Sequence, residues 1–414
     1  MFYKFLKILV GFTLRVFFRK IYISGIEHVQ HSKAQLIASN HPNGFLEPLL
    51  MACFFPKDLH FLVRGDVFDN PFLKPILRST HQIPIFRFRD GFSKLRENSQ
   101  TMDESYQVLL EHKNLLIFAE GGTESIKKLR PLQKGIARIG FQVLEKKSDL
   151  EIEILPVGIN FTYPSLFNAE VMLKVGKPID IKAHFSTYTQ DKNTGYQFLL
   201  DELYQSMQSN VIHLENQERV VTFENLLSLK RMEYATNILP VLNESDERLL
   251  AEKKMANVVD ALPDEKLVLI NDAIKNLSND AKAASITLQD IRKKSADFIS
   301  YAVLIVGLVP AVLGFMTHGL PISIGYIFTK TKVKAKEFRA SILMVSVMVM
   351  ILLWYILLII IGVSYHLPWY CLVVVPLSGL WARYYYTYQS ELVFVSHQKL
   401  QVLKEKASII LSSL

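Results

Sequence analysis

The sequence contains little cysteine: only Cys53 and Cys371 occur in 414 residues, and both lie in apolar surroundings. Two isolated cysteines provide neither a disulfide framework nor a metal site, and they fit a reducing compartment. The chain also has no zinc-finger spacing and no run of closely spaced basic residues interleaved with aromatics. Because these features are missing, we expect no nucleic-acid partner, and we predict neither a metal nor a cofactor.

A Gly-x-Ser-x-Gly nucleophile elbow is absent as well. Its absence argues against an acyl-enzyme intermediate on serine. A hydrolase is also disfavoured, because the sequence shows no nucleophile and no cluster of metal ligands.

What the chain does contain is basic and apolar. Lysine and arginine number 47 against 39 acidic residues, and half of all residues are hydrophobic. This combination favours a membrane surface or an anionic substrate as partner. The length leaves room for two or more domains.

Residues 1–23 are apolar and carry basic residues at Lys4, Lys7, Arg15 and Arg19. The basic positions recur every three to four residues, so they share one helical face, which is typical of a helix lying in the membrane interface. A helix docked on the protein is the first alternative. A membrane span or a signal peptide is disfavoured by the charges and by the lack of a small-residue cleavage site.

Residues 24–185 alternate between strand and helix patterns, which predicts an α/β domain with a mainly parallel sheet flanked by helices. The predicted strands are Gln35–Ser39, Leu59–Val63, Gln82–Phe86, Asn114–Phe118, Ile152–Ile159 and Val171–Val175, and the clearest helices are Ser93–His112 and Lys134–Lys147. Ligand sites in such sheets form at the strand ends.

Residues 186–297 are polar and helical in period, which predicts a helical arm without catalytic residues. Residues 298–388 form the expected membrane region. The apolar stretch Phe298–Phe328 is interrupted by prolines and glycines and has basic residues on both flanks. Positive flanks on both sides favour a broken or re-entrant hairpin over one straight span. Two spans over Ser341–Val363 and Tyr365–Ala382 follow, and residues 389–414 are expected to form a cytoplasmic C-terminal helix.

The most informative motif is Leu36–Pro48, where a short apolar strand ends in the turn Asn40-His41-Pro42-Asn43-Gly44 and a helix begins at Glu47-Pro48. His41 and Glu47 are therefore expected to meet, with the carboxylate orienting the imidazole and the imidazole accepting a proton from a hydroxyl. Taken alone, such a His–Glu pair is more often a surface histidine in a polar loop, and the rest of the chain changes this balance.

Three further motifs follow: His81–Arg87, Leu116–Ser125 with Leu129–Arg138, and Ile154–Ile159. With these four motifs in this order, residues 30–180 resemble the glycerolipid acyltransferases, which acylate glycerol 3-phosphate, dihydroxyacetone phosphate or lysophosphatidate. The five residues between His41 and Glu47 are similar to the branch of fungal-type glycerol-3-phosphate/dihydroxyacetone-phosphate acyltransferases.

The resemblance implies a role for each residue of the motifs. His41 would be the general base and Glu47 its orienting carboxylate. Substrate-binding residues would be Arg87, Glu120, Gly121, Gly122, Lys128, Arg130 and Pro156. Arginine offers bidentate contacts to a phosphate, and the glycines allow backbone N–H groups to approach a phosphate or an oxyanion.

The sequence departs from the family pattern in the first and third motifs, where Ala119 also replaces the usual proline. Glu47 replaces the usual aspartate, and the arginine of the third motif is missing, so that Lys127, Lys128 and Arg130 are the candidates to supply its charge. The resemblance implies a membrane-bound enzyme that transfers a fatty acyl group from acyl-CoA or acyl-carrier protein to a glycerol-phosphate-type acceptor, in contact with membrane phospholipid. The basic flanks and the hairpin arrangement predict a multi-pass protein with its catalytic domain on the cytoplasmic side. The alternatives are a non-phosphate lipid acceptor, or a degenerate acyltransferase fold that serves as a lipid-binding scaffold.

Overall fold

The computed structural model describes residues 2–86, 98–234 and 237–414. Arg87, which the sequence places in the acceptor site, lies outside the described residues. The chain divides into two compact units. The first comprises Met1–Arg15, Ile21–Ile212 and Leu242–Asp246, and the second comprises Val16–Lys20, His213–Val241 and Glu247–Leu414.

The first unit is built on a sheet with the strand order β4-β3-β5-β2-β6-β7-β1-β9, and β8 also pairs with β6. The strands are β1 (Lys20–Ser24), β2 (Ala34–Ser39), β3 (Leu59–Arg64), β4 (Gln82–Ile85), β5 (Asn114–Phe118), β6 (Ile152–Phe161), β7 (Glu170–Val175), β8 (Ile179–Asp180) and β9 (Leu242–Asn243). From β4 to β6 all neighbouring strands are parallel, whereas β7 and β8 run antiparallel to β6. The predicted α/β fold with a mainly parallel sheet is thus confirmed.

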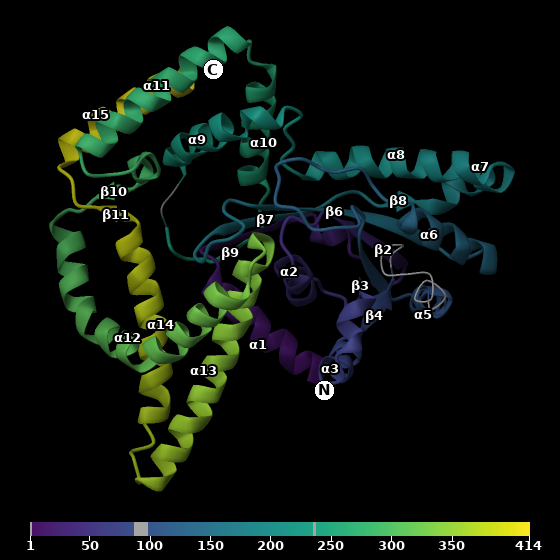
Figure 1. Cartoon of the computed structure of the whole chain (residues 1–414), viewed down its shortest axis with the longest axis horizontal. Helices are drawn as coiled ribbons and strands as arrows, with labels where there is room; N and C mark the ends of the chain where they lie inside the picture. The colour runs from purple at the N-terminus through teal and green to yellow at the C-terminus, as the bar shows by residue number, and fades with distance from the viewer. Residues whose placement is uncertain (1, 87–97, 235–236) are drawn as a thin grey trace. The chain divides into compact units, whose positions relative to one another are not determined.

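Strand β2 lies at the centre of the parallel part, and all of its residues are buried. Helices cover both faces of the sheet, with α6 and α8 on one face and α1 and α2 on the other (Figure 1). The helices of this unit are α1 (Phe2–Phe17), α2 (Leu46–Phe54), α3 (Leu73–Ser79), α5 (Asn98–Leu110), α6 (Gly135–Lys146), α7 (Phe185–Gln190) and α8 (Lys192–Asn210). Leu36 and Ala38 of β2 pack in one cluster with Ile136 of α6 and Leu199 of α8.

The structure differs from the sequence prediction at both borders of this unit. Helix α1 ends at Phe17, and residues 20–24 form the edge strand β1 instead of continuing the helix. At the other end, the unit extends past residue 185 to Ile212. The reason is that Leu199, Leu203 and Met207 of α8 are fully buried in the core of the α/β unit.

Helix α1 buries Val10 and Leu14 and exposes a second set of apolar side chains, while Lys7 and Arg15 make contacts with the protein. The ammonium group of Lys7 donates to the Phe55 carbonyl at 3.1 Å, and the Arg15 guanidinium lies 4.8 Å from the ring centroid of Phe54. The exposed apolar side chains are Phe2, Phe5, Ile8 and Phe12. Such an outward apolar face fits a helix at a membrane interface, which stays a prediction.

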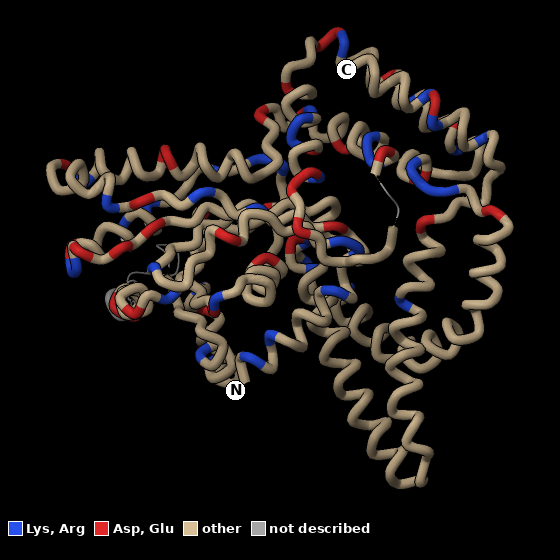
Figure 2. Tube along the Cα trace, turned by 180° about the vertical axis from the view of Figure 1, so that it is seen from behind, with Lys and Arg blue, Asp and Glu red and all other residues tan. Residues whose placement is uncertain are grey.

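The second unit is helical. Its helices are α9 (Val220–Lys230), α10 (Glu247–Ala261), α11 (Asp264–Ala283), α12 (Phe298–Lys332), α13 (Arg339–Ser364), α14 (Cys371–Ser390) and α15 (His397–Ser412). Two short strands, β10 (Lys294–Ser295) and β11 (Leu392–Val393), pair in parallel. Lys336–Ser364 and Phe298–Lys332 are long and apolar enough to cross a membrane by length and composition, and Figure 2 shows few charged residues along α12–α14.

Helix α12 bends near its middle (Figure 1). Its first half runs antiparallel along α14 and its second half antiparallel along α13. The contacts are Tyr385 Oη to the Leu304 carbonyl (3.1 Å), Trp381 Nε1 to the Gly307 carbonyl (3.0 Å), Trp354 Nε1 to the Thr317 carbonyl (2.7 Å) and Thr329 Oγ1 to Ser346 Oγ (3.3 Å). Because α13 and α14 are antiparallel neighbours along the chain, both ends of α12 lie at the same end of the α13–α14 pair.

Pro321 gives a physical reason for the bend. Proline has no N–H to donate to the carbonyl four residues earlier, and its ring displaces that carbonyl from the helix. This carbonyl belongs to Thr317, and it accepts the indole N–H of Trp354 instead. The polar backbone group exposed by the bend is therefore satisfied by a neighbouring helix, as a membrane environment requires. Insertion of α12 as a re-entrant hairpin stays a prediction.

A pair of glycines tests the packing of the α/β unit. A Cβ atom on Gly158 of β6 would lie 2.1 Å from the Asn210 carbonyl oxygen, whereas a Cβ atom on Gly135 would meet nothing within 4 Å. We expect Gly158→Ala to destabilise the protein by about 1–3 kcal/mol, the usual cost of overpacking. Gly135→Ala, at the start of α6, should leave stability unchanged or raise it. Thermal denaturation of the purified protein measures both, and equal midpoints for the two variants would contradict the packing described.

Candidate active site

The site lies where β2 and β5 end side by side. Ser39, the last residue of β2, is in register with Phe118, the last residue of β5. His41 follows β2 by two residues and Glu120 follows β5 by two residues. Because both strands are parallel, the loops after them emerge at the same edge of the sheet, which is the usual place for a site in an α/β fold.

The structure brings His41 and Glu47 together, as the sequence predicts. Glu47 lies in the first turn of α2 and is fully buried. Its Oε1 atom is 3.7 Å from Nδ1 of His41. Nδ1 of His41 and Oε2 of Glu47 are both buried without a hydrogen-bond partner among the described residues. The gap is longer than a hydrogen bond, but catalytic hydrogen bonds often tighten only when substrate is bound.

Burial dominates the electrostatics of Glu47. Removal from water raises the pKa of its carboxyl above the ordinary value, and the neighbouring His41 acts in the opposite direction. The backbone N–H of Asn43 donates to Oε1 and fixes the carboxylate in place. A carboxylate in this position is stabilised when a positive charge develops on the imidazole, because opposite charges attract strongly in a poorly solvated site.

The main chain of His41 is held on both sides by the loop after β5. Its N–H donates to Oε2 of Glu120 at 3.0 Å, and its carbonyl accepts the N–H of Glu124 at 3.1 Å. The imidazole ring stacks on the ring of Phe118 with the centroids 3.7 Å apart and an angle of 12° between the planes. These contacts fix the imidazole ring with its Nδ1 atom facing Glu47.

Glu120, which the sequence suggests as a substrate-binding residue, has its carboxylate engaged by three donors within the protein. Besides the His41 N–H, its carboxylate accepts the backbone N–H of Arg130 at 2.9 Å and Nη2 of Arg130 at 3.0 Å. The carboxylate is nearly inaccessible to solvent. With three donors already bound, Glu120 positions the His41 loop and the Arg130 guanidinium, and its geometry offers little to an acceptor molecule.

The guanidinium group of Arg130 is also hydrogen-bonded within the protein. Its guanidinium donates to the Gly122 carbonyl in addition to Glu120. Most of its positive charge is thus balanced by a buried carboxylate, which weakens the case for Arg130 as the sole phosphate ligand. Lys127, the neighbouring candidate, donates to the Phe161 carbonyl at 2.9 Å. Lys128 lies in the same loop, and its role in substrate binding stays a prediction.

The remaining predicted residues lie near this edge in different settings. Gly121 has a φ of +69°, and a Cβ atom there would lie 2.8 Å from Cγ of Gln133, so the turn favours glycine. Gly122 has no such constraint. Pro156 is buried in β6 opposite Ala38. Strand β6 pairs with β8 up to Ile154 and with β7 from Val157, so Pro156 occupies the gap between them and shapes the sheet.

Sequence reasoning missed two residues that hold the His41 loop. The side-chain amide of Asn40 donates to the Ile159 carbonyl at 2.9 Å, and its Oδ1 accepts the Ile159 N–H at 2.8 Å. Phe118 supplies the stacking surface for the imidazole. An asparagine directly before the histidine was visible in the turn, but the partner on β6 was not, because the contact spans 119 positions in the chain.

Comparison with known proteins identifies this part of the chain. A family model described as acyltransferase matches residues 20–160. Glycerol-3-phosphate O-acyltransferase 1 of Saccharomyces cerevisiae is 26% identical over 146 residues, which make up 34% of this chain and 19% of the yeast protein. Residues 20–160 thus match an acyltransferase domain and are similar to a glycerolipid acyltransferase.

Two further proteins are similar to parts of this chain. An uncharacterized acyltransferase of Schizosaccharomyces pombe is 21% identical over 156 residues, covering 37% of this chain and 23% of that protein. The aligned region thus spans about a fifth of either curated relative. Among solved structures, the 1-acyl-sn-glycerophosphate (LPA) acyltransferase PlsC of Thermotoga maritima is similar with a TM-score of 0.34 and 17% identity, over 46% of this chain and 71% of PlsC.

The buried carboxylate of the acyltransferase domain leads to a stability prediction. Since burial raises the pKa of Glu47, the unfolded state loses this proton at a lower pH than the folded state, and the residue makes folding less favourable as the pH rises above about 4.3. We expect Glu47→Gln to raise the thermal unfolding midpoint at about pH 7. The amide can still accept the Asn43 N–H, and the difference from the wild type should vanish near pH 4, where both states are protonated.

Denaturation scans between about pH 4 and pH 8 on both proteins measure this difference. A midpoint that falls in the variant at neutral pH would show instead that the Glu47 charge stabilises the folded state.

Proposed function

We propose that this protein is a membrane-bound O-acyltransferase that uses His41 as general base and Glu47 as its orienting carboxylate. The acyl donor is acyl-CoA or acyl-carrier protein, and the acceptor is glycerol 3-phosphate, dihydroxyacetone phosphate or lysophosphatidate. The observation that carries the proposal is the placement of Nδ1 of His41 opposite the buried Glu47 carboxylate, within a matched acyltransferase domain.

The proposed reaction needs only a base and a fixed geometry. Nε2 of His41 takes the proton of the acceptor hydroxyl while its oxygen attacks the thioester carbonyl, which forms a tetrahedral oxyanion. The carbonyl re-forms, the carbon–sulfur bond breaks, and the thiolate takes the proton from the imidazolium. A positioned imidazole contributes roughly 10²–10⁴-fold to such a step, and the buried Glu47 carboxylate stabilises the transient imidazolium.

The acceptor is the open part of the proposal. Arg130 is paired with Glu120 and Lys127 with a carbonyl, so recognition of a phosphate depends on Arg87, on Lys128 or on a rearrangement of this loop. We assign the phosphate-binding role to Arg87 and Lys128, with Gly122 offering its backbone N–H group, because the N–H of Gly121 already donates to the Phe118 carbonyl at 3.1 Å. Because the Arg130 guanidinium is already paired with Glu120, the structure favours a lipid acceptor without a phosphate as the alternative.

Membrane attachment is supported by features of each unit taken separately. In the first unit, α1 exposes Phe2, Phe5, Ile8 and Phe12. In the second unit, two helices are long and apolar enough to cross a membrane. An enzyme that makes or uses a lipid benefits from this attachment, because its lipid substrate is concentrated in the bilayer. We place the catalytic domain on the cytoplasmic side.

Acyl transfer by detergent-purified protein tests the proposal. Labelled acyl-CoA and acyl-carrier protein are offered with glycerol 3-phosphate, dihydroxyacetone phosphate, lysophosphatidate and a lysolipid without a phosphate monoester. We expect transfer to one acceptor class and a loss of about 10²–10⁴-fold in His41→Ala, because the proton acceptor is gone.

The matched control is His31→Ala, which removes an exposed histidine shortly before β2 and should keep full activity. Equal activity of His41→Ala and wild type would refute the proposed base.

The 3.7 Å gap between His41 and Glu47 also favours a second candidate, a degenerate acyltransferase fold that binds lipid as a scaffold. Absence of transfer from a well-folded protein to every acceptor in the panel would select this candidate.

A further inference from the structure

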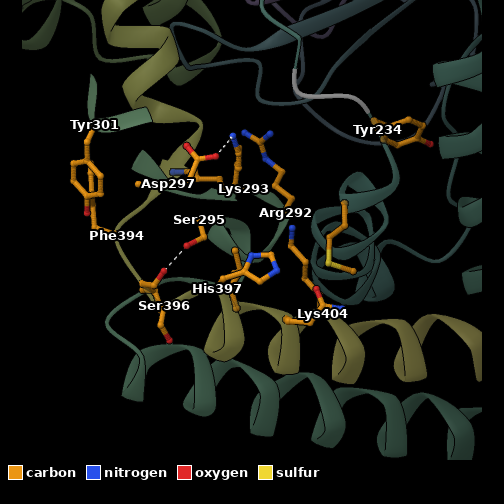
Figure 3. A pocket seen from close by; sticks show the side chains of 16 residues that line it. Tyr234, Arg292, Lys293, Ser295, Asp297, Tyr301, Phe394, Ser396, His397 and Lys404 are labelled. Carbon is orange, nitrogen blue, oxygen red and sulfur yellow. Dashed lines mark hydrogen bonds and ion pairs between the residues drawn. The ribbon is translucent and has the colours of Figure 1, made fainter. Parts of the chain in front are cut away.

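The second unit contains a cavity of about 750 Å³ at the base of α12. Its walls are the segment Arg292–Asp297, the segment Phe394–His397 after β11, and the first turns of α15 (Figure 3). The pairing of β10 with β11 ties the first two walls together, and Ser295 Oγ donates to the Val395 carbonyl at 2.5 Å. The walls of the cavity are therefore held together by strand pairing and a side-chain hydrogen bond.

The lining is strongly basic. It contains Arg292, Lys293, Lys294 and Lys404 against one carboxylate, that of Asp297. Figure 3 shows Arg292 and Lys293 above the cavity and His397 and Lys404 of α15 below it. Such a concentration of cations with few lining carboxylates favours an anionic ligand.

Three of the four cations already have carboxylate partners. Arg292 makes a bidentate contact with Glu391 at 2.8 and 3.0 Å, Lys293 lies 2.6 Å from Asp290, and Lys294 lies 2.9 Å from Asp297. Lys404 differs, because no hydrogen bond or ion pair of its ammonium group occurs within the described residues.

Partial burial lowers the pKa of Lys404. In its charged form, the ammonium group has no carboxylate among the described residues to balance it. A bound anion would supply the missing partner.

The border of the cavity is apolar on the side of α12. Asp297 caps this helix by accepting the N–H of Ser300 at 2.8 Å, and the next residues, Phe298 and Ile299, are 87% and 68% exposed. The rings of Tyr301 and Phe394 lie 5.9 Å apart at the rim. Cations beside an exposed apolar helix start and aromatic side chains match the level of lipid head groups.

We propose that this cavity binds the phosphate of an anionic phospholipid, with Lys404 as the principal ligand and the acyl chains lying along the exposed start of α12. A soluble phosphate ion carries the same anionic group as the lipid head group. The apolar border of the cavity favours the lipid over the soluble ion. The inference rests on the proposed membrane placement of α12–α14 and is independent of the acyl-transfer reaction.

Lipid retention by the full-length protein tests the site without any acyl donor. Detergent-purified wild type is equilibrated with mixed micelles of phosphatidylglycerol and phosphatidylcholine, and bound lipid is counted by native mass spectrometry. A parallel arm adds inorganic phosphate as competitor. We expect preferential retention of phosphatidylglycerol and a loss of about fivefold in affinity for Lys404→Gln, since one basic residue near an anionic lipid contributes about 1 kcal/mol.

Two variants make the result specific. Lys399→Gln removes an exposed lysine of the same helix that does not line the cavity and should leave retention unchanged. Lys404→Arg keeps the charge and should restore binding, which separates a lost ligand from a damaged fold.

Equal losses in Lys404→Gln and Lys399→Gln would overturn the assigned site. Displacement of the lipid by millimolar inorganic phosphate, with no preference for the lipid, would overturn the assigned ligand. Failure of acyl transfer alone bears only on the proposed enzyme function, because no donor is present in this measurement.

Discussion

One buried carboxylate, that of Glu120, ties together the two loops that form the candidate site. It accepts hydrogen bonds from the N–H of His41 after β2 and from Arg130 in the loop after β5. Buried charges are tolerated only when they are paired and hydrogen-bonded, and this one has three donors. The position of the His41 ring therefore depends on a residue that touches no reacting atom in the proposed mechanism. Phe118 and Asn40 complete the support with a stacked ring and a pair of backbone hydrogen bonds.

Glu47 shows the opposite situation. It is fully buried, one of its oxygens has no partner, and burial raises the pKa of its carboxyl. A structure that served stability alone would avoid such a group. Its presence beside an imidazole is accounted for if a positive charge develops there during a reaction, since perturbed groups cluster at functional sites. The pair lies within residues 20–160, which match an acyltransferase model, and acyl transfer is the reaction that we propose for it.

The central strands could be predicted because β2, β5 and β6 are nearly continuous apolar runs, as is typical of buried parallel strands. The two-residue strands β8 and β9 were missed, since such short pairings leave no periodic signal. The meeting of His41 and Glu47 followed from a turn and a helix start that lie close together in the chain. The pairing of Glu120 with Arg130 did not, because the sequence does not show which way a loop side chain points. For α12, the prolines and basic flanks predicted a break, whereas the structure keeps one bent helix, with Trp354 binding the carbonyl that Pro321 leaves free.

The measurement that tests the account most directly is a double-mutant cycle on the acyl-transfer rate with His41→Ala, Glu47→Gln and the double variant. If Glu47 acts only through His41, removing both should cost no more than removing His41 alone, because residues that act as a unit are not additive. The account predicts a large loss in His41→Ala, a smaller loss in Glu47→Gln, and no further loss in the double variant. Additive losses, or full activity of Glu47→Gln, would contradict the claim that this pair forms the catalytic centre.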